Sequence, residues 1–477
     1  MSEIKDAHAP ATDEASSSEN NVAKPVSTRT PRWYYLLDAF IIIAMGAILF
    51  WGASSQFSNK YNDATRYQCY GISFWQGKAA LQAQGLDNNA KSQCAFLDTS
   101  SSSTLAGKMQ ARHFPSFLVS LVQSQSTTQA FHALPPEYPL LTLAIFSLPL
   151  FASGLWYQMF FALFMIIAAA VMYLLIARFR SRPAAIVFAF YLAVGSWATA
   201  LGRFDLVPAA LTLGAAILAA RARWHWAYFL IALATLLKLY PVIFIPIFLI
   251  AQQKQIDGSW KVWQRWQGLA LFVATCAAVT IVSLLLNVGN TLYPINYFLS
   301  RPIQVESLPG TLLWLGQFVH SPAQYIFTYQ SLNFSSLLAH KVSLLSTFLL
   351  VVGLCYTFWL QWRGKLDIFT ASLVTLLAIV ILGKVFSPQY LIWITPFVAY
   401  IGKQNWKWIV SWGAVCALTT FVFPFNYADI PHIDHVYPAI IARDVIILGT
   451  ALVLLYQATR KRYVLDENTR NAVHARA

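Results

Sequence analysis

Charged and hydrogen-bonding side chains recur at the ends of apolar segments in this chain of 477 residues. They are Asp63, Arg66, Arg203, Asp205, Lys238, Tyr240, Arg301, Glu306, Lys384, Gln389 and Tyr390. A carboxylate beside several cations suits glycosyl transfer from a phosphorylated lipid, because the carboxylate takes a proton from the acceptor hydroxyl while Lys and Arg stabilise the departing phosphate. The competing chemistry, glycoside hydrolysis by paired carboxylates, leaves the cations unexplained.

Apolar runs of helix-spanning length must position these side chains. Hydrophobic residues make up 57% of the chain and charged residues only 11%, against about 25% charged residues in a soluble domain. We therefore expect an all-α, multi-pass membrane protein with about twelve transmembrane helices. The predicted crossings are 36–51, 155–176, 184–200, 206–220, a short pair within 226–251 that breaks between Lys238 and Pro241, 269–287, 342–360, 368–382, 390–401, 408–422 and 440–456.

The formal net charge of +14 is interpreted as a topology signal and not as a sign of nucleic-acid binding. Lys and Arg lie mainly in short connections between apolar runs, as the positive-inside rule predicts for cytoplasmic loops. Both termini are then cytoplasmic in a bacterial inner (plasma) membrane, and the side chains named above face the extracytoplasmic side. Charges on that side are costly, so they imply a functional cavity or internal pairing. Pairing of Arg203 with Asp205 and of Arg301 with Glu306 is an open alternative.

Composition divides the chain into three parts. We expect a disordered cytoplasmic tail at 1–32, a transmembrane domain at 33–459 and a basic cytoplasmic tail at 460–477. The first apolar run is followed by no small-residue cleavage site, so we expect it to remain as an anchor. Residues 138–151 are apolar but too short to span a bilayer, and we expect them to be half-buried.

The longest polar stretch, residues 54–137, is predicted to be an extracytoplasmic loop. Apolar residues at mixed helical spacing within it predict amphipathic helices at 61–78 and 108–122, lying along the membrane surface. Cys69 and Cys94 share this loop, where they form either a disulfide or two free thiols.

The order of these residues resembles that of the polytopic glycosyltransferases of the C-type superfamily. Within that superfamily it is similar to family 87, the bacterial polyprenyl-phosphate-mannose-dependent mannosyltransferases. The resemblance rests on Asp63 with Tyr67 and Gly77, on Tyr138-Pro139, on residues 203–205 with Pro208, on residues 238–241, on residues 301–310 and on residues 387–393. It implies an inverting transfer outside the cytoplasm, from a sugar on a polyprenyl monophosphate to a glycolipid or glycan acceptor.

The resemblance also implies roles for the individual residues. Asp63 matches the general base, although an Asp in this place can also serve only as a helix cap. Lys238 and Arg301 would contact the donor phosphate, with Arg203 and Lys384 as second choices; Lys238 can also be a snorkelling end residue. The expected substrate-binding residues are Arg66, Asp205, Tyr240, Glu306, Gln389 and Tyr390.

No cofactor and no metal are expected. Members of the superfamily that use a cation carry an acidic pair on the first loop, and here Asn62 stands beside Asp63. A multi-pass transporter or lipid flippase is the rival class, since Lys238 and Lys384 each end an apolar run before a Pro-containing segment, as in broken transporter helices.

Overall fold

The computed structural model describes residues 32–55, 57, 63–77, 79–83, 94, 102–128, 132–152, 154–256, 261–319, 324–329, 331–427 and 430–460. Most of that length is helical. The predicted tails at 1–32 and 460–477 lie outside the described residues except for Arg32 and Arg460. The chain divides into two compact units, one ending at Phe40 and the other running from Ile41 to Ala477. The helix packing that positions the candidate site belongs to the second unit.

Six helices within the described ranges are long and apolar enough to cross a membrane. They are α1 (Arg32–Ser54), α8 (Leu155–Phe179), α13 (Gln267–Leu286), α16 (Ala339–Trp362), α19 (Trp406–Thr420) with its continuation η4 (Phe421–Asn426), and α20 (Tyr437–Arg460) with the preceding η5 (Ile430–Val436). Five shorter apolar helices are α9 (Arg182–Gly195), α10 (Leu206–Ala220), α11 (Trp224–Leu237), α17 (Ile368–Leu382) and α18 (Tyr390–Gly402). The protein is thus a predominantly helical, multi-pass membrane protein, and the number twelve stays a prediction.

The run 226–251 is broken where its sequence predicts a break. Helix α11 ends at Leu237, Lys238 is extended, and the 3-10 turn η2 (Tyr240–Ile243) leads into α12 (Phe244–Gln255). Pro241 explains the break, because its ring fixes φ and it offers no backbone N–H to continue the helix. The break places the Lys238 side chain between two short helices, where it is 17% exposed.

The loop helices differ from the expectation in burial and in length. Helix α2 (Asp63–Gln76) lies within the predicted 61–78, but nearly all of its residues are buried, so it does not lie along a membrane surface. Its aromatic side chains cause this, because Tyr67 stacks on Phe146 at a centroid distance of 4.3 Å. The predicted helix 108–122 is two helices, since Pro115 separates them. The short elements of this region are α3 (Ala80–Ala83), α5 (Ser102–Ala111), α6 (Ser116–Thr128) and α7 (Thr142–Ser147).

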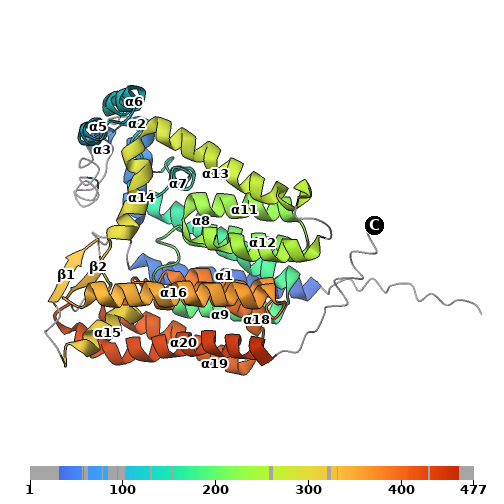
Figure 1. The fold of residues 1–477 in the computed structure, drawn as a ribbon. Coiled ribbons are helices and arrows are strands. Elements are labelled where there is room, and N and C mark those ends of the chain that lie inside the picture. The colour runs from blue at the N-terminus through green and yellow to red at the C-terminus, as the bar shows by residue number, and fades with distance from the viewer. Residues whose placement is uncertain are drawn as a thin grey trace, which may run out of the picture. The chain divides into compact units, whose positions relative to one another are not determined.

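A β-hairpin was missed by the all-α expectation. Strands β1 (Gln324–Thr328) and β2 (Ser331–Ser335) pair antiparallel, with Gln324 opposite Ser335. The remaining elements are η3 (Trp263–Arg265), α14 (Val288–Ser300) and α15 (Leu308–Gly316). Helix α14 runs from the end of α13 toward the hairpin, as Figure 1 shows.

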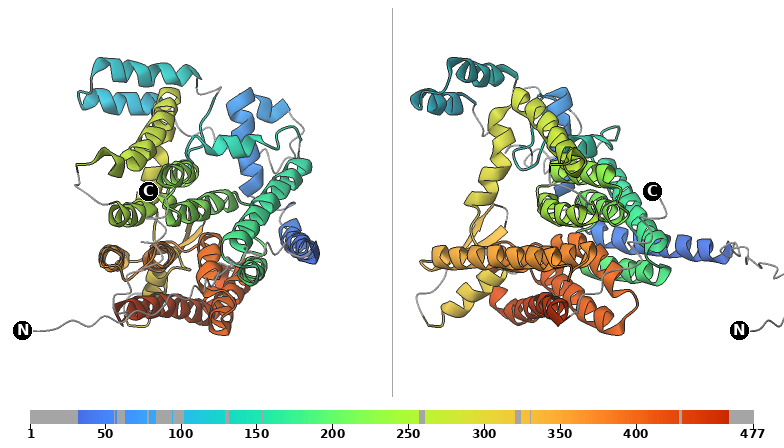
Figure 2. Two further views of the ribbon diagram at one scale, coloured as in Figure 1. Left: turned by 90° about the vertical axis from the view of Figure 1, so that its right-hand side faces the viewer. Right: turned by 45° about the vertical axis from the view of Figure 1, so that its right-hand side comes forward.

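Long helices lie side by side, and the short elements gather at one of their ends. In Figure 1, α8, α11, α13, α16 and α20 run in a common direction, while α2, α5, α6, α14 and the hairpin lie at the end where α16 begins. In the right-hand view of Figure 2, α5 and α6 again stand apart from α16 and α20. Helix α9 packs against α18 and α19, α10 packs against α11, and α16 packs against α17. The loops that carry the candidate residues meet at the end with the short elements.

Candidate active site

Asp63 is ion-paired with Arg203 from a distant loop. Asp63 begins α2, and Arg203 lies in the turn between α9 and α10; Asp63 Oδ2 lies 2.8 Å from Arg203 Nε. The same guanidinium donates through Nη1 to Gln389 Oε1. The expected alternative, an Arg203–Asp205 pair, is therefore wrong. Asp63 Oδ1 has no hydrogen-bond partner among the described residues, and the side chain is 18% exposed.

Asp205 is paired with Lys238 and lies inside the protein. Lys238 Nζ is 2.5 Å from Asp205 Oδ1, and Trp393 Nε1 donates to the same oxygen at 2.6 Å. The ammonium also lies over the rings of Phe204 and Trp393, at 5.2 and 5.1 Å. Asp205 is only 1% exposed, and its Oδ2 is buried with no hydrogen-bond partner in the described part of the chain. This carboxylate therefore holds a cation and is poorly placed to meet an acceptor hydroxyl.

Three aromatic rings form a stack beside that ion pair. Trp393 lies between Tyr240, at a centroid distance of 4.1 Å, and Tyr390, at 4.2 Å. Tyr240 and Tyr390 were expected as substrate contacts, and the structure brings them together through an indole that has no such role in the sequence expectation. The stack fixes the rings that border the Asp205–Lys238 pair, since offset aromatic contacts add to area burial.

Arg301 and Lys384 differ from the other two cations because no carboxylate pairs with either among the described residues. Arg301 Nη2 donates to Ser331 Oγ at 3.0 Å, and Arg301 Nε is buried with no hydrogen-bond partner among the residues that the structure describes. Lys384 Nζ donates to the carbonyl oxygen of Leu299 at 2.7 Å. Burial and the charge of Arg301 both lower the pKa of Lys384. Two neighbouring like charges disfavour each other, and an anion placed between them would favour the charged form of both.

Arg66 has an internal partner that the sequence did not suggest. Its Nη1 lies 2.9 Å from Glu137 Oε2, to which the hydroxyl of Tyr70 also donates at 3.5 Å. Burial lowers the pKa of Arg66, but Glu137 and Asp63 raise it more, so that it lies above its ordinary value. Glu137 was missed; the available signal was its position at the end of the long loop, directly before Tyr138-Pro139.

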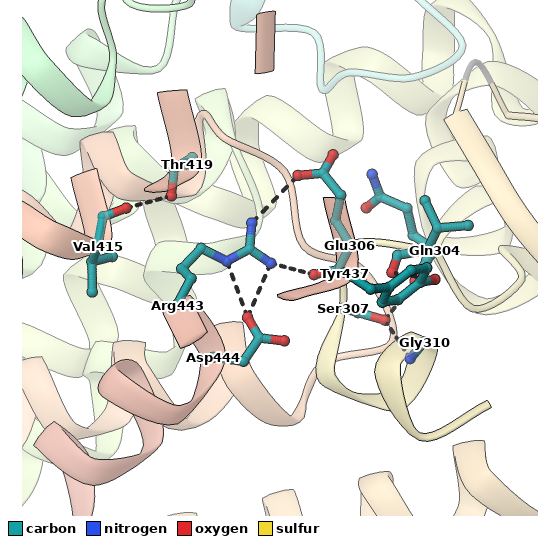
Figure 3. A network of polar contacts seen from close by, with 10 residues as sticks. Gln304, Glu306, Ser307, Gly310, Val415, Thr419, Tyr437, Arg443 and Asp444 are labelled. Carbon is teal, nitrogen blue, oxygen red and sulfur yellow. Dashed lines mark hydrogen bonds and ion pairs between the residues drawn. The ribbon is translucent and has the colours of Figure 1, made fainter. Parts of the chain in front are cut away.

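Glu306 is bound to Arg443 and not to Arg301, which corrects the expected pair. Figure 3 shows Arg443 between two carboxylates. Its Nη1 lies 3.4 Å from Glu306 Oε2, its Nη2 donates to the Glu306 carbonyl, and Nε and Nη2 both donate to Asp444 Oδ1 at 3.0 Å. The guanidinium also covers the ring of Phe386 at 3.6 Å.

This network places Glu306 inside the protein, with an exposed fraction of 1%. Burial raises the pKa of Glu306 to about 7, although Arg443 opposes the shift. The sequence signal for Arg443 was available, because Arg443-Asp444 is a charged pair within the apolar run 440–456. Charged residues within such runs almost always pair or mark a functional path.

Cys69 and Cys94 are joined by a disulfide bond, with their Cα atoms 5.6 Å apart. The bond ties α2, which carries Asp63, to a later part of the loop. Cys276, Cys355 and Cys416 are free thiols.

Comparison with known proteins identifies a family whose model matches this chain. The model of glycosyltransferase family 87 matches residues 137–388, which is more than half of the chain. No curated protein matches. Among solved structures, the crystal structure of ArnT from Cupriavidus metallidurans bound to undecaprenyl phosphate is similar over 90% of this chain and 78% of that chain, with 12% identity and a TM-score of 0.42.

Proposed function

Since the chain belongs to glycosyltransferase family 87, we propose that it moves a sugar, mannose in the first place, from a polyprenyl-phosphate donor to an extracytoplasmic glycolipid or glycan acceptor. The observation that carries the proposal is the arrangement of charge at the site. Within the described structure, Asp63 keeps one unpartnered carboxylate oxygen, and Arg301 and Lys384 form a neighbouring pair of cations that no carboxylate neutralises. A base and an anion site are the two parts that this transfer needs.

Asp63 is the general base in this proposal. Its Oδ1 takes the proton of the acceptor hydroxyl as the hydroxyl oxygen attacks the anomeric carbon from the face opposite the phosphate, which inverts that carbon. The bond between the anomeric carbon and the phosphate oxygen breaks, and the lipid phosphate leaves with the bonding electrons. Arg203 fixes the direction of the carboxylate through the 2.8 Å contact between its Nε and Asp63 Oδ2.

Arg301 and Lys384 are the proposed ligands of the donor phosphate. The expectation ranked Lys238 with Arg301 and put Lys384 and Arg203 second. Lys238 and Arg203 each have a carboxylate partner within 2.8 Å, so an arriving phosphate would have to compete with that carboxylate. A phosphate at Arg301 and Lys384 would instead relieve the repulsion between two cations.

Family membership favours a transferase over the rival transporter or lipid flippase. No metal is part of the proposed reaction; the described residues contain no group of three or more His, Cys, Asp or Glu that could hold one, and independence of metal stays a prediction.

Membranes containing the protein, incubated with radiolabelled polyprenyl-phosphate mannose, test the proposal. Asp63→Asn and Asp63→Ala should lower the initial rate of label transfer by roughly 10²–10⁴-fold, the usual contribution of a general base. Asp434→Asn is the matched control, because Asp434 accepts hydrogen bonds only from Trp314 and Tyr325 in the described structure. Transfer at the wild-type rate by both Asp63 variants would exclude Asp63 as the base. Parallel donors that carry glucose or arabinose test the choice of mannose.

A further inference from the structure

A largely apolar groove lies between α8, α10 and α11; along α10 its lining runs from Val207, two residues after Asp205, to Arg221. Its volume is about 530 Å³, which is within the range of ligand pockets. Small and aliphatic side chains line it, among them Ala168, Val171, Leu175, Leu211, Gly214 and Leu230. Val171 is 44% exposed and lies on the same helix as the exposed Leu163, Ile167 and Leu174. The groove therefore opens toward the side of the bundle that would face lipid.

The groove has about the length of one lipid leaflet. Its lining on α8 extends from Ala168 to Phe179, eleven residues along the helix and thus about 16 Å at 1.5 Å per residue. Half of the hydrocarbon core of a bilayer is about 15 Å thick. One acyl chain lying along α8 would match that length.

Arginines close one end of the groove. Arg221 and Arg223 are part of its lining. The guanidinium of Arg221 covers the ring of Phe179 at 4.1 Å, and that of Arg178 lies 5.8 Å from the same ring. Within the described ranges no carboxylate forms an ion pair with any of these three arginines. A stretch of positive charge at the end of an apolar groove is complementary to an anionic lipid headgroup.

Asp367 is an acidic residue near this cluster, and its carboxylate is hydrogen-bonded to the start of α17. Asp367 acts on Tyr400 together with Arg180 and Arg221. Its carboxylate accepts hydrogen bonds from the backbone N–H groups of Phe369 and Thr370, at 2.9 and 3.0 Å, and from the hydroxyl of Thr370 at 2.7 Å. Asp367 is thus the N-cap of α17, and it forms no ion pair with Arg221 in the described part of the chain.

We propose that this groove binds an anionic glycerophospholipid, with its phosphate at Arg221 and Arg223 and one acyl chain along α8 between Ala168 and Phe179. The proposed headgroup position lies at the other end of α10 from Asp205, and binding there does not depend on the transfer reaction. A topology signal alone would place arginine at a helix end without a groove, as at Arg363, which covers Trp359 at 5.9 Å and is not part of this lining.

Nanodiscs with equal amounts of phosphatidylglycerol and phosphatidylcholine, followed by native mass spectrometry of the released protein, test the proposal. The wild type should retain more phosphatidylglycerol than phosphatidylcholine. The double variant Arg221→Gln/Arg223→Gln should bind it about 30-fold more weakly, which corresponds to about 1 kcal/mol per arginine. Arg363→Gln is the matched control, an arginine on an aromatic ring at another helix end, and should behave as the wild type.

Two more variants separate charge from folding. Arg221→Lys/Arg223→Lys keeps the charge and should keep the preference. Gly214→Leu keeps both arginines but fills the groove, since a Cβ at Gly214 would already lie 3.4 Å from Leu230 Cδ1; it should lower retention of phosphatidylglycerol at an unchanged gel-filtration profile. Equal retention of the two phospholipids by the wild type, or undiminished retention of phosphatidylglycerol by the double glutamine variant, would overturn the proposal.

Discussion

Ion pairs divide the charged side chains of the candidate site into two kinds. Arg203 and Lys238 are held by Asp63 and Asp205, whereas Arg301 bonds only to neutral groups in the described structure. A cation that is already neutralised is committed to its counter-charge, and a cation without an acid is available for a ligand. The same residue types thus serve different purposes, depending on which loop lies opposite.

The Asp205–Lys238 pair gives a prediction about stability. Asp205→Asn or Lys238→Met alone leaves one buried partner without its counter-charge, and the loss of such a partner costs about 3–5 kcal/mol. The double variant Asp205→Asn/Lys238→Met removes both charges, so it should recover most of the thermal stability lost by Lys238→Met. Melting temperatures in detergent measure this, and equal losses in the single and double variants would contradict a coupled pair.

Glu306 gives a prediction about pH. Burial raises its pKa to about 7, against about 4.3 for an exposed Glu. Between these two pH values the folded protein keeps a proton that the unfolded chain releases, so stability falls as pH rises through this window and is level above it. The melting temperature of the wild type should therefore drop between pH 5 and pH 7.5 more than that of Glu306→Gln. An equal drop in both proteins would refute the assignment.

The sequence was enough to predict which charged residues belong to the candidate site and that they lie at one end of the bundle. It was not enough to predict which of them pair. Hydropathy places Asp63, Arg203 and Lys238 at the ends of apolar runs, because runs and basic connections determine topology. Which acid meets which cation depends on how α2, α10 and α11 pack, and that information is not local. For this reason the Arg203–Asp205 pair was plausible from sequence although Asp63 is the true partner of Arg203.

The segment 301–307 shows how elements position a residue of the site. Ile303 and Val305 bond to β2 through their main chains, with Phe334 N–H donating to the Ile303 carbonyl at 2.8 Å and Val305 N–H donating to the Leu332 carbonyl at 3.2 Å. Ser307 then caps α15 by accepting from the backbone N–H of Gly310 at 3.1 Å. The segment that carries Arg301 is thus held between the hairpin and a helix start.

Gly310 gives a prediction about this segment. A Cβ there would collide with the carbonyl oxygen of Gln304 and lie 2.9 Å from that of Val305, so Gly310→Ala must move the chain that carries Arg301. We expect a higher KM for the polyprenyl-phosphate donor, measured in the transfer assay. Gly316→Ala in the same helix is the control, because its Cβ would meet only Leu338 Cδ1 at 3.8 Å. Equal kinetics for both variants would argue against the segment as a donor site.

Helices were predictable from the sequence where a long apolar run dominates. A helix occupies each of the apolar runs, and the break before Pro241 followed from proline chemistry. The hairpin was not predictable, since β1 and β2 are strands of only five residues each and β2 also bonds to the segment 301–307. The burial of α2 was missed for a similar reason: its neutral composition resembles a surface helix, while its partners come from α7 and α8.

At the scale of the whole molecule, the two ends of the bundle differ in chemistry. The end with α2, α14 and the hairpin holds acidic and basic side chains that form ion pairs with one another. The connection 178–182 and residues 221–223 bring basic residues to the other end, and no acid lies in these two stretches. Positive-inside topology assigns the basic end to the cytoplasm, so the proposed donor would reach Asp63 from the opposite side.

Cysteine labelling in intact cells tests that orientation. In a background with Cys276, Cys355 and Cys416 changed to Ser, the bonded Cys69 and Cys94 do not react. Phe327→Cys, at an exposed position of β1, should react with a membrane-impermeant maleimide in intact cells. Gln404→Cys, at an exposed turn between α18 and α19, should react only after permeabilisation.

The reversed pattern would place Asp63 in the cytoplasm and remove the basis for an extracytoplasmic acceptor. The labelling result does not depend on catalysis, because neither position belongs to the proposed site. An orientation as predicted together with inactive Asp63 variants would support the transferase, whereas the same orientation with active Asp63 variants would leave the topology intact and require another base. Glu137 would then be the next carboxylate to test, since it reaches the same end of the bundle through Arg66.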